Sequence, residues 1–228
     1  MIGVIGAEPL VRWDWLRDHL TCFGSDCIPT RLWEHVVLTS LAVAIGFAIS
    51  LPVSIYAQRH RRAYPPVTFF AGFLYTIPSL ALFVLLIPFT GLSLVTAEIG
   101  LVSYTLLILI RNIVAGLAGV PTDVKEAGVG MGYGRGSLLR EVELPLALPA
   151  VVAGIRVATV TTVGLVTVTA LIGYGGLGHF ILKGLQTFFS TATLLGAVGS
   201  VLLAVMADGL LLLAGRLLAP WSRPRSLA

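Results

Sequence analysis

Four long stretches of this sequence contain no Asp, Glu, Lys or Arg, and they restrict the chain to one structural class. They run over residues 35–58, 63–97, 157–182 and 184–207. A helix needs about 20 apolar residues to cross a bilayer, whereas a buried strand spans only about 4–8 residues. The stretches therefore predict membrane-spanning helices and an all-α integral membrane protein.

Composition excludes the soluble and disordered classes. Charged residues make up 11% and apolar residues 57% of the 228 residues, against about 25% and 45–50% in ordinary soluble domains. Nucleic-acid binding would need a dense basic stripe, and the sequence has none despite its net charge of +4. The positions of the few charges are therefore more informative than their sum.

Helix breakers and polar flanks divide the apolar stretches into five expected spans. Pro78 lies inside the second span, where a proline can kink a helix. Pro149 is expected in the first turn of the fourth span, and residues 177–189 are too few to cross. The spans are expected at about residues 36–57, 67–89, 94–118, 149–172 and 194–218.

Basic residues orient the chain, because cytoplasmic loops are rich in Lys and Arg. They follow the first span, separate the third from the fourth, and occur in the C-terminal tail. This predicts a multi-pass plasma (inner) membrane protein of bacterial type, with its N-terminus outside and its C-terminus in the cytoplasm. We expect an extracytoplasmic segment 1–35, a membrane domain 36–218 with a cytoplasmic loop 120–148, and a cytoplasmic tail 219–228, with no cleavable signal peptide. The orienting residues are Arg59, Arg61, Arg62, Lys125, Arg135, Arg140, Arg223 and Arg225.

Cys22 and Cys27 both lie in the segment expected outside the cytoplasm, where a disulfide can form. Two free thiols are an equally good interpretation of the sequence. No metal site is expected, because two cysteines five residues apart provide only half of a four-ligand set. The histidines are too scattered to complete one: they are His19, His35, His60 and His179.

The polar segment 120–148 separates the third span from the fourth. Asp123 followed by Glu126 fits a helix-capping arrangement, which predicts a short helix over about residues 124–131. Alternate glycines then allow a sharp turn, and Ser137 is expected to cap a second short helix that leads into the fourth span. A connection of this length usually has a function, although a plain loop is the alternative.

One pattern in this segment resembles a known motif. Glu126-Ala127-Gly128, Gly132 and Val142-Glu143-Leu144-Pro145 resemble the EAA motif of ABC-importer permeases, with the same spacing throughout. Gly128 replaces an alanine and Val142 an isoleucine. The resemblance implies the type I ABC importer permease fold and a coupling helix that docks on a separate ATPase. It assigns ATPase coupling to Glu126, Ala127, Gly128, Gly132, Leu144 and Pro145.

Four further segments are similar to permeases for the osmoprotectants glycine betaine, carnitine and choline. They are residues 75–83, 110–112, 153–158 and 172–178. The resemblance implies a transport subunit rather than an enzyme, working by alternating access with a second permease subunit, identical or homologous, and an extracytoplasmic substrate-binding protein. A permease for methionine or another amino acid is the alternative within this family, and a secondary transporter is the alternative outside it.

Nucleotide binding is not expected in this chain. It contains no GxxxxGK[ST] sequence, so ATP and magnesium are expected in the partner ATPase and no cofactor in this subunit. Residues 173–178 fit the pattern GxGxxG, but an apolar helix rather than a strand is expected before them. We therefore expect a tight outer loop there instead of a dinucleotide site.

Arg156 and Asp208 are charged residues inside the fourth and fifth spans. Such residues seldom face lipid, and a rise of about 1.5 Å per residue places both at similar depths. We expect an ion pair or a polar contact at a dimer interface, with Arg111 as a competing partner. A direct substrate role for Asp208 is the alternative. Glu98 is expected at a solvated rim.

Threonines in the fourth span suit either a hydrated pathway or close helix packing with hydroxyls bonded to their own helix. Aromatic residues near the spans are able to bind a quaternary ammonium, but they more often pack against neighbours. The sequence therefore assigns no substrate-binding residue. The residues in question are Thr159, Thr161, Thr162, Thr167, Thr169, Phe73, Tyr75, Tyr104 and Tyr174.

Overall fold

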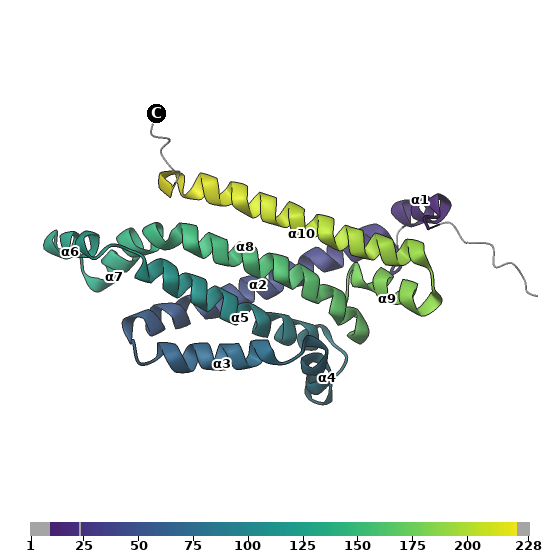
Figure 1. Ribbon diagram of the computed structural model, residues 1–228, viewed down its shortest axis with the longest axis horizontal. Coiled ribbons are helices and arrows are strands. Elements are labelled where there is room, and N and C mark those ends of the chain that lie inside the picture. The colour runs from purple at the N-terminus through teal and green to yellow at the C-terminus, as the bar shows by residue number, and fades with distance from the viewer. Residues whose placement is uncertain (1–9, 23, 223–228) are drawn as a thin grey trace, which may run out of the picture.

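The computed structural model describes residues 10–22 and 24–222, and within these ranges every regular element is helical. The long helices lie roughly along one axis, with α6 (Thr122–Gly130) and α7 (Arg135–Leu138) at one end of the bundle and α1 (Trp13–Thr21) and α9 (Gly178–Thr187) at the other (Figure 1). Four helices are long and apolar enough to cross a membrane, as the sequence predicts for an all-α membrane protein. The long helices are α2 (Ile28–Arg59), α5 (Leu94–Ala118), α8 (Leu144–Val168) and α10 (Ser190–Leu218).

The core lies where α2, α5 and α8 pack against one another. Gly46 on α2 makes close packing possible, because a Cβ there would overlap the side chain of Thr105 on α5. Small residues let membrane helices approach in this way. By contrast, only 6% of the apolar window of α10 is buried inside the chain, so most of α10 faces lipid or another subunit.

Two of the five expected spans match the helices closely, and the first is longer than expected. The third coincides with α5, and α10 contains the fifth. The first begins at Ile28, well before the expected residue 36. Pro29 suits the first helical turn, and Arg31 bonds Glu34 one turn later at 2.7 Å, so these charged residues are part of the helix. The short α9 agrees with the expectation that residues 177–189 do not cross.

The second expected span is broken at Pro78, where the sequence allows a kink, and the break is far sharper than a kink. Two shorter helices, α3 (Tyr64–Thr76) and α4 (Ser79–Thr90), meet at an angle of 95°. Pro78 lacks an N–H group and disfavours helical geometry at the residue before it, and Ile77 is indeed extended. The Tyr104 hydroxyl donates to the Ile77 carbonyl freed at this joint. The protein has five spans if this bent pair counts as one.

The fourth span begins earlier than expected, and Pro149 lies inside α8 rather than in its first turn. Pro145 takes the early helical position instead. Upstream, α7 runs through a π-helical turn, η1 (Leu139–Glu143), directly into α8. After α8 the chain tightens into a 3₁₀ turn, η2 (Thr169–Ile172), so that residues 135–172 form one long helical path.

Candidate functional site

Helix α6 contains the first half of the motif at one end of the bundle. It begins at Thr122 with Pro121 as its N-cap, and no side chain caps it. The predictions of an Asp123 cap and of a helix over 124–131 are therefore wrong by two residues at the start. Asp123 lies within the first turn instead, where its negative charge still complements the helix dipole.

A tight turn joins α6 to α7. Gly132 has a φ of +87°, which is unfavourable for residues with a side chain, so this glycine is required by the turn. Helix α7 begins after Gly134, and Ser137 lies inside it, where its hydroxyl donates to the Gly134 carbonyl at 3.0 Å. The prediction that Ser137 caps this helix is wrong, because the extended backbone at Gly134 starts the helix earlier.

Two basic side chains attach this end segment to the long helices. Lys125 donates from Nζ to the Leu117 carbonyl in the last turn of α5, at 3.2 Å. Arg59, at the end of α2, donates to the carbonyl of Arg135 in α7 at 3.1 Å. A movement imposed on α6 and α7 would therefore reach α2, α5 and, through η1, α8.

The outer face of α6 carries an exposed carboxylate among apolar side chains. Glu126 and Ala127 are exposed, as are Val129 and Met131, the latter 71% accessible. Such exposed apolar groups at the end of a bundle favour contact with another protein. Gly128 lies on the inner face and is buried against α7, Gly132 is exposed, and Leu144 and Pro145 are half-buried where α8 begins.

The structure brings Arg156 and Asp208 together across α8 and α10. The guanidinium donates from Nε to Oδ1 at 2.8 Å and from Nη2 to Oδ2 at 2.7 Å. Two parallel hydrogen bonds of this kind fix both distance and orientation. Arg111 is exposed on α5 and is not the partner of Asp208.

Glu98 is buried, which contradicts the expected solvated rim. Only 7% of the residue is exposed, and neither carboxylate oxygen has a hydrogen-bond partner within the described ranges. Glu98 lies one turn into α5, where the sequence placed it. Its position along the helix, however, does not reveal which helix face points into the core.

Most threonine hydroxyls in α8 bond to their own helix. Thr159, Thr162 and Thr167 donate to carbonyls three or four residues earlier, and Thr169 does the same in η2. This favours packing over a hydrated lining at those positions. Thr161 differs because it lines a pocket between α8 and α10.

The four candidate aromatic residues do not form a cage. Tyr75 and Tyr104 meet edge to face with ring centroids 5.6 Å apart. Tyr174 packs against the core cluster around Leu38, while Phe73 is exposed on α3.

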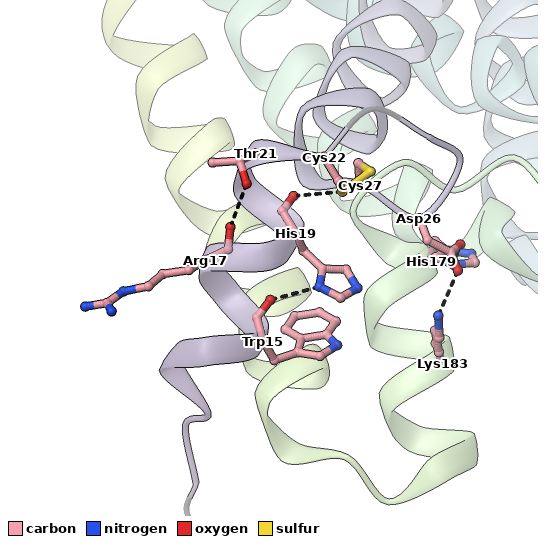
Figure 2. The surroundings of a disulfide bond; sticks show 9 residues. All are labelled: Trp15, Arg17, His19, Thr21, Cys22, Asp26, Cys27, His179 and Lys183. Atoms are coloured by element: carbon pink, nitrogen blue, oxygen red, sulfur yellow. Dashed lines mark hydrogen bonds and ion pairs between the residues drawn. A yellow bond between two sulfur atoms is a disulfide. The ribbon is translucent and has the colours of Figure 1, made fainter.

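The N-terminal end of α2 is joined to the segment before it by a disulfide between Cys22 and Cys27 (Figure 2). Next to it, Lys183 on α9 donates to Asp26 at 2.9 Å, and His179 Nε2 lies 3.0 Å from the same carboxylate. The hydrogen bond from Lys183 holds the pKa of Asp26 below its usual value, and burial lowers the pKa of His179. The sequence indicated the disulfide as one of two possibilities but did not indicate this cluster.

His35 is a structural residue that the sequence did not identify as one. The Leu177 N–H donates to its Nδ1 at 3.3 Å, so the ring hydrogen lies on Nε2 and points at the Val163 carbonyl, 3.0 Å away. The ring thus joins α2 to α8 and to the loop before α9. Gly176 packs directly against His35, and helical η2 precedes this GxGxxG segment. The segment is therefore a helix connection, as expected.

The described residues contain no group of three or more His, Cys, Asp or Glu side chains able to hold a metal ion. Two of the residues used for orientation, Arg223 and Arg225, lie outside the described ranges.

Comparison with known proteins identifies a family and close relatives. The family described as "Binding-protein-dependent transport system inner membrane component" matches residues 36–226. The osmoprotectant import permease protein OsmW of Salmonella typhimurium is 36% identical over 198 residues, covering 85% of this chain and 92% of that protein. The choline transport system permease protein OpuBB of Bacillus subtilis is 34% identical over 190 residues, with coverages of 83% and 88%.

A solved structure has the same architecture. It is an inward-facing conformation of the MetNI methionine ABC transporter, with a TM-score of 0.70 and 26% identity. The match covers 86% of this chain and 96% of that chain. The type I ABC importer permease fold implied by the motif is therefore confirmed.

Proposed function

The chain belongs to the binding-protein-dependent transport system inner membrane components, and on this basis we propose that it is the transmembrane subunit of an importer for osmoprotectants such as glycine betaine, choline or carnitine. The relatives named for osmoprotectants and choline are 34–36% identical to it, against 26% for the methionine transporter. These identities favour osmoprotectants over methionine, which is the second candidate substrate.

The observation that carries the coupling role is the arrangement of α6. Glu126 projects from an exposed helix whose base is held by Lys125 and, through α7, by Arg59. A surface held in this way transmits a push as a rigid-body movement. A separate ATPase, which would bind ATP and magnesium, is the partner that fits this surface.

The remaining partners follow from the same assignment. The α6 end would face the cytoplasm, and the α1 and α9 end would receive the substrate-binding protein outside, where the disulfide is stable. A second permease subunit would cover α10, since little of that helix is buried by its own chain. Substrate and nucleotide would each favour a different state of this assembly.

The coupling role is tested by Glu126→Lys in the transporter reconstituted with its ATPase and binding protein. We expect an inserted protein whose substrate-stimulated ATPase activity falls at least tenfold. Glu141→Lys is the matched control, because Glu141 is also exposed but lies beyond the turn, in η1. Stimulation that survives Glu126→Lys unchanged would refute coupling through α6. Uptake of labelled glycine betaine, carnitine, choline and methionine into the vesicles identifies the substrate class.

A further inference from the structure

A pocket of about 500 Å³ opens between α8 and α10 at the level of the Arg156–Asp208 pair. Its walls are mostly apolar, and Arg156 and Asp208 are the charged residues among those that line it. Pockets for small molecules have volumes of about 300–1,000 Å³ and combine apolar walls with a few polar groups. The apolar wall residues include Ala153, Val157, Val160, Ala204 and Val205.

Both charged groups of the ion pair remain accessible to a ligand. Its side chains are 28% and 36% exposed, so they lie at the pocket surface rather than within the helix contact. A guanidinium has five N–H donors, and Asp208 accepts from two of the Arg156 nitrogens. The remaining edge of the guanidinium is able to bind a second carboxylate while Asp208 stays in place.

The chemistry of the pocket matches a zwitterion. A ligand carboxylate would bind Arg156, and a cationic group would lie near Asp208, so the neutral pair would hold a neutral ligand. Methyl groups on a quaternary ammonium cannot donate hydrogen bonds and suit the valine and alanine walls. A simple cation would instead leave one uncompensated positive charge in a membrane environment, which is costly.

The pocket continues along the bundle. A second, smaller pocket of about 130 Å³ shares Ala153 and Arg156 with the first and extends to Pro149 and Gly215. It leads toward the end of α10 that lies at the same end of the bundle as α6 (Figure 1). The two pockets thus form one groove that passes the ion pair.

We propose that this groove is a binding site for a small zwitterion that carries a quaternary ammonium and a carboxylate, held between Asp208 and Arg156 during transport. The inference rests on the proposed function, because a second permease subunit must cover the groove to separate it from lipid. It adds a selectivity: zwitterions such as glycine betaine are transported in preference to the cation choline.

The competing explanation is that the pair only joins α8 to α10. The two explanations differ for the variant Arg156→Met/Asp208→Leu, because replacing an ion pair by apolar residues often preserves stability. A joining role predicts normal uptake. A binding role predicts a transporter that assembles normally, as judged by size-exclusion chromatography, but takes up labelled glycine betaine at least tenfold more slowly.

The matched control is Arg31→Met/Glu34→Leu. It removes another bonded Arg–carboxylate pair, on α2, which does not line the groove. We expect this control to take up glycine betaine at close to the wild-type rate, at saturating loaded binding protein. Equal uptake by wild type and the groove variant would overturn the proposed site.

Selectivity provides a second measurement. Arg156→Gln removes the group that binds the ligand carboxylate and leaves Asp208 negative, so uptake of glycine betaine should fall at least tenfold while uptake of choline rises. Equal losses for both substrates would contradict the site. If the wild-type transporter imports methionine and neither quaternary ammonium compound, the proposed substrate class itself fails; if it imports glycine betaine regardless of these substitutions, only the site fails.

Discussion

Gly128 on α6 lies against Leu138 on α7, and a Cβ atom at position 128 would come within 2.6 Å of Leu138 Cδ1. The absence of a side chain at position 128 lets α6 and α7 pack closely against each other here. The obstructing atom is the end of a flexible side chain, so a small addition can be accommodated by a rotamer change, whereas a branched one cannot.

We therefore expect Gly128→Ala to retain substrate-stimulated ATPase activity and Gly128→Ile to lose most of it, since overpacking costs about 1–3 kcal/mol. Leu138→Ala should restore activity to Gly128→Ile by making room. Gly130→Ile is the control on the same helix, because a Cβ there meets nothing within 4 Å. If Gly128→Ile keeps full substrate-stimulated ATPase activity, then α6 and α7 need not stay in contact.

The bond from Lys125 to the Leu117 carbonyl leads to a second prediction. Lys125→Met keeps most of the side-chain length but removes the ammonium group that hydrogen-bonds the Leu117 carbonyl, one of the carbonyls at the end of α5 that lack a partner within the helix. Hydrogen bonds from charged groups contribute about 1.5–3 kcal/mol, so we expect stimulated ATPase activity to fall several-fold. Lys125→Arg should retain it. The measurement is ATPase activity with and without loaded binding protein; full stimulation in Lys125→Met would exclude this attachment.

The motif drew attention to residues 126–145, which lie at one end of the bundle, but the helix boundaries within this segment were less predictable. Asp123 and Ser137 are both good capping residues, yet Pro121 and Gly134 precede them and adopt the extended geometry at which the helices start. Local preferences compete within a few residues. The spacing of a motif does not determine which one prevails.

The joint between α3 and α4 provides a third prediction. The Tyr104 hydroxyl bonds the Ile77 carbonyl, which has lost its helical partner at the bend. Tyr104→Phe removes this donor and should lower the free energy of unfolding by about 1–3 kcal/mol, the cost of leaving a buried polar group unsatisfied. Thermal unfolding in detergent measures the loss. Tyr64→Phe is the control, because no hydrogen bond of its hydroxyl is found within the described residues; equal effects of both changes would argue against a specific bond.

The contact between Asp26 and Lys183 predicts a dependence on pH. Lys183 lowers the pKa of Asp26, so folding favours the ionised carboxylate. Its stabilising effect is present above the ordinary pKa of 3.8 and is lost as the pH falls through the lower folded-state value. Because the Asp26 side chain is 50% exposed, we expect at most about 1 kcal/mol.

Hydrogen exchange of the segment around Asp26 between pH 5 and pH 3 tests this effect. Opening should increase at the acidic end in wild type, and Asp26→Asn should open equally at both values. Asp18→Asn, on the exposed side of α1, should behave like wild type. A wild-type segment that is equally protected across this range would contradict the prediction.

The ends of a helix can be predicted from the sequence where local helix breakers set them, and not where contacts with distant residues do. The third span was located correctly because the turn at Thr90-Gly91 precedes it and Gly119 and Pro121 follow it, and both interrupt helix formation. The sequence indicated Pro78 as a possible kink before α4, but the angle of 95° was not predicted, since a proline permits a bend without setting its angle. Packing contributes here: the ring of Phe83 on α4 fits against Gly100 on α5, a contact between distant parts of the chain.

The exposed surface of α10 has a consequence for the life of the protein in the cell. A copy synthesised without its neighbours would present this helix, and the charged groove beside it, to lipid or to whatever else the bilayer contains. A copy left in this state would be open to proteolysis, so the amount of this protein should follow the supply of its partners rather than its own rate of synthesis. The long helix that its own chain buries least would then determine how long each copy survives.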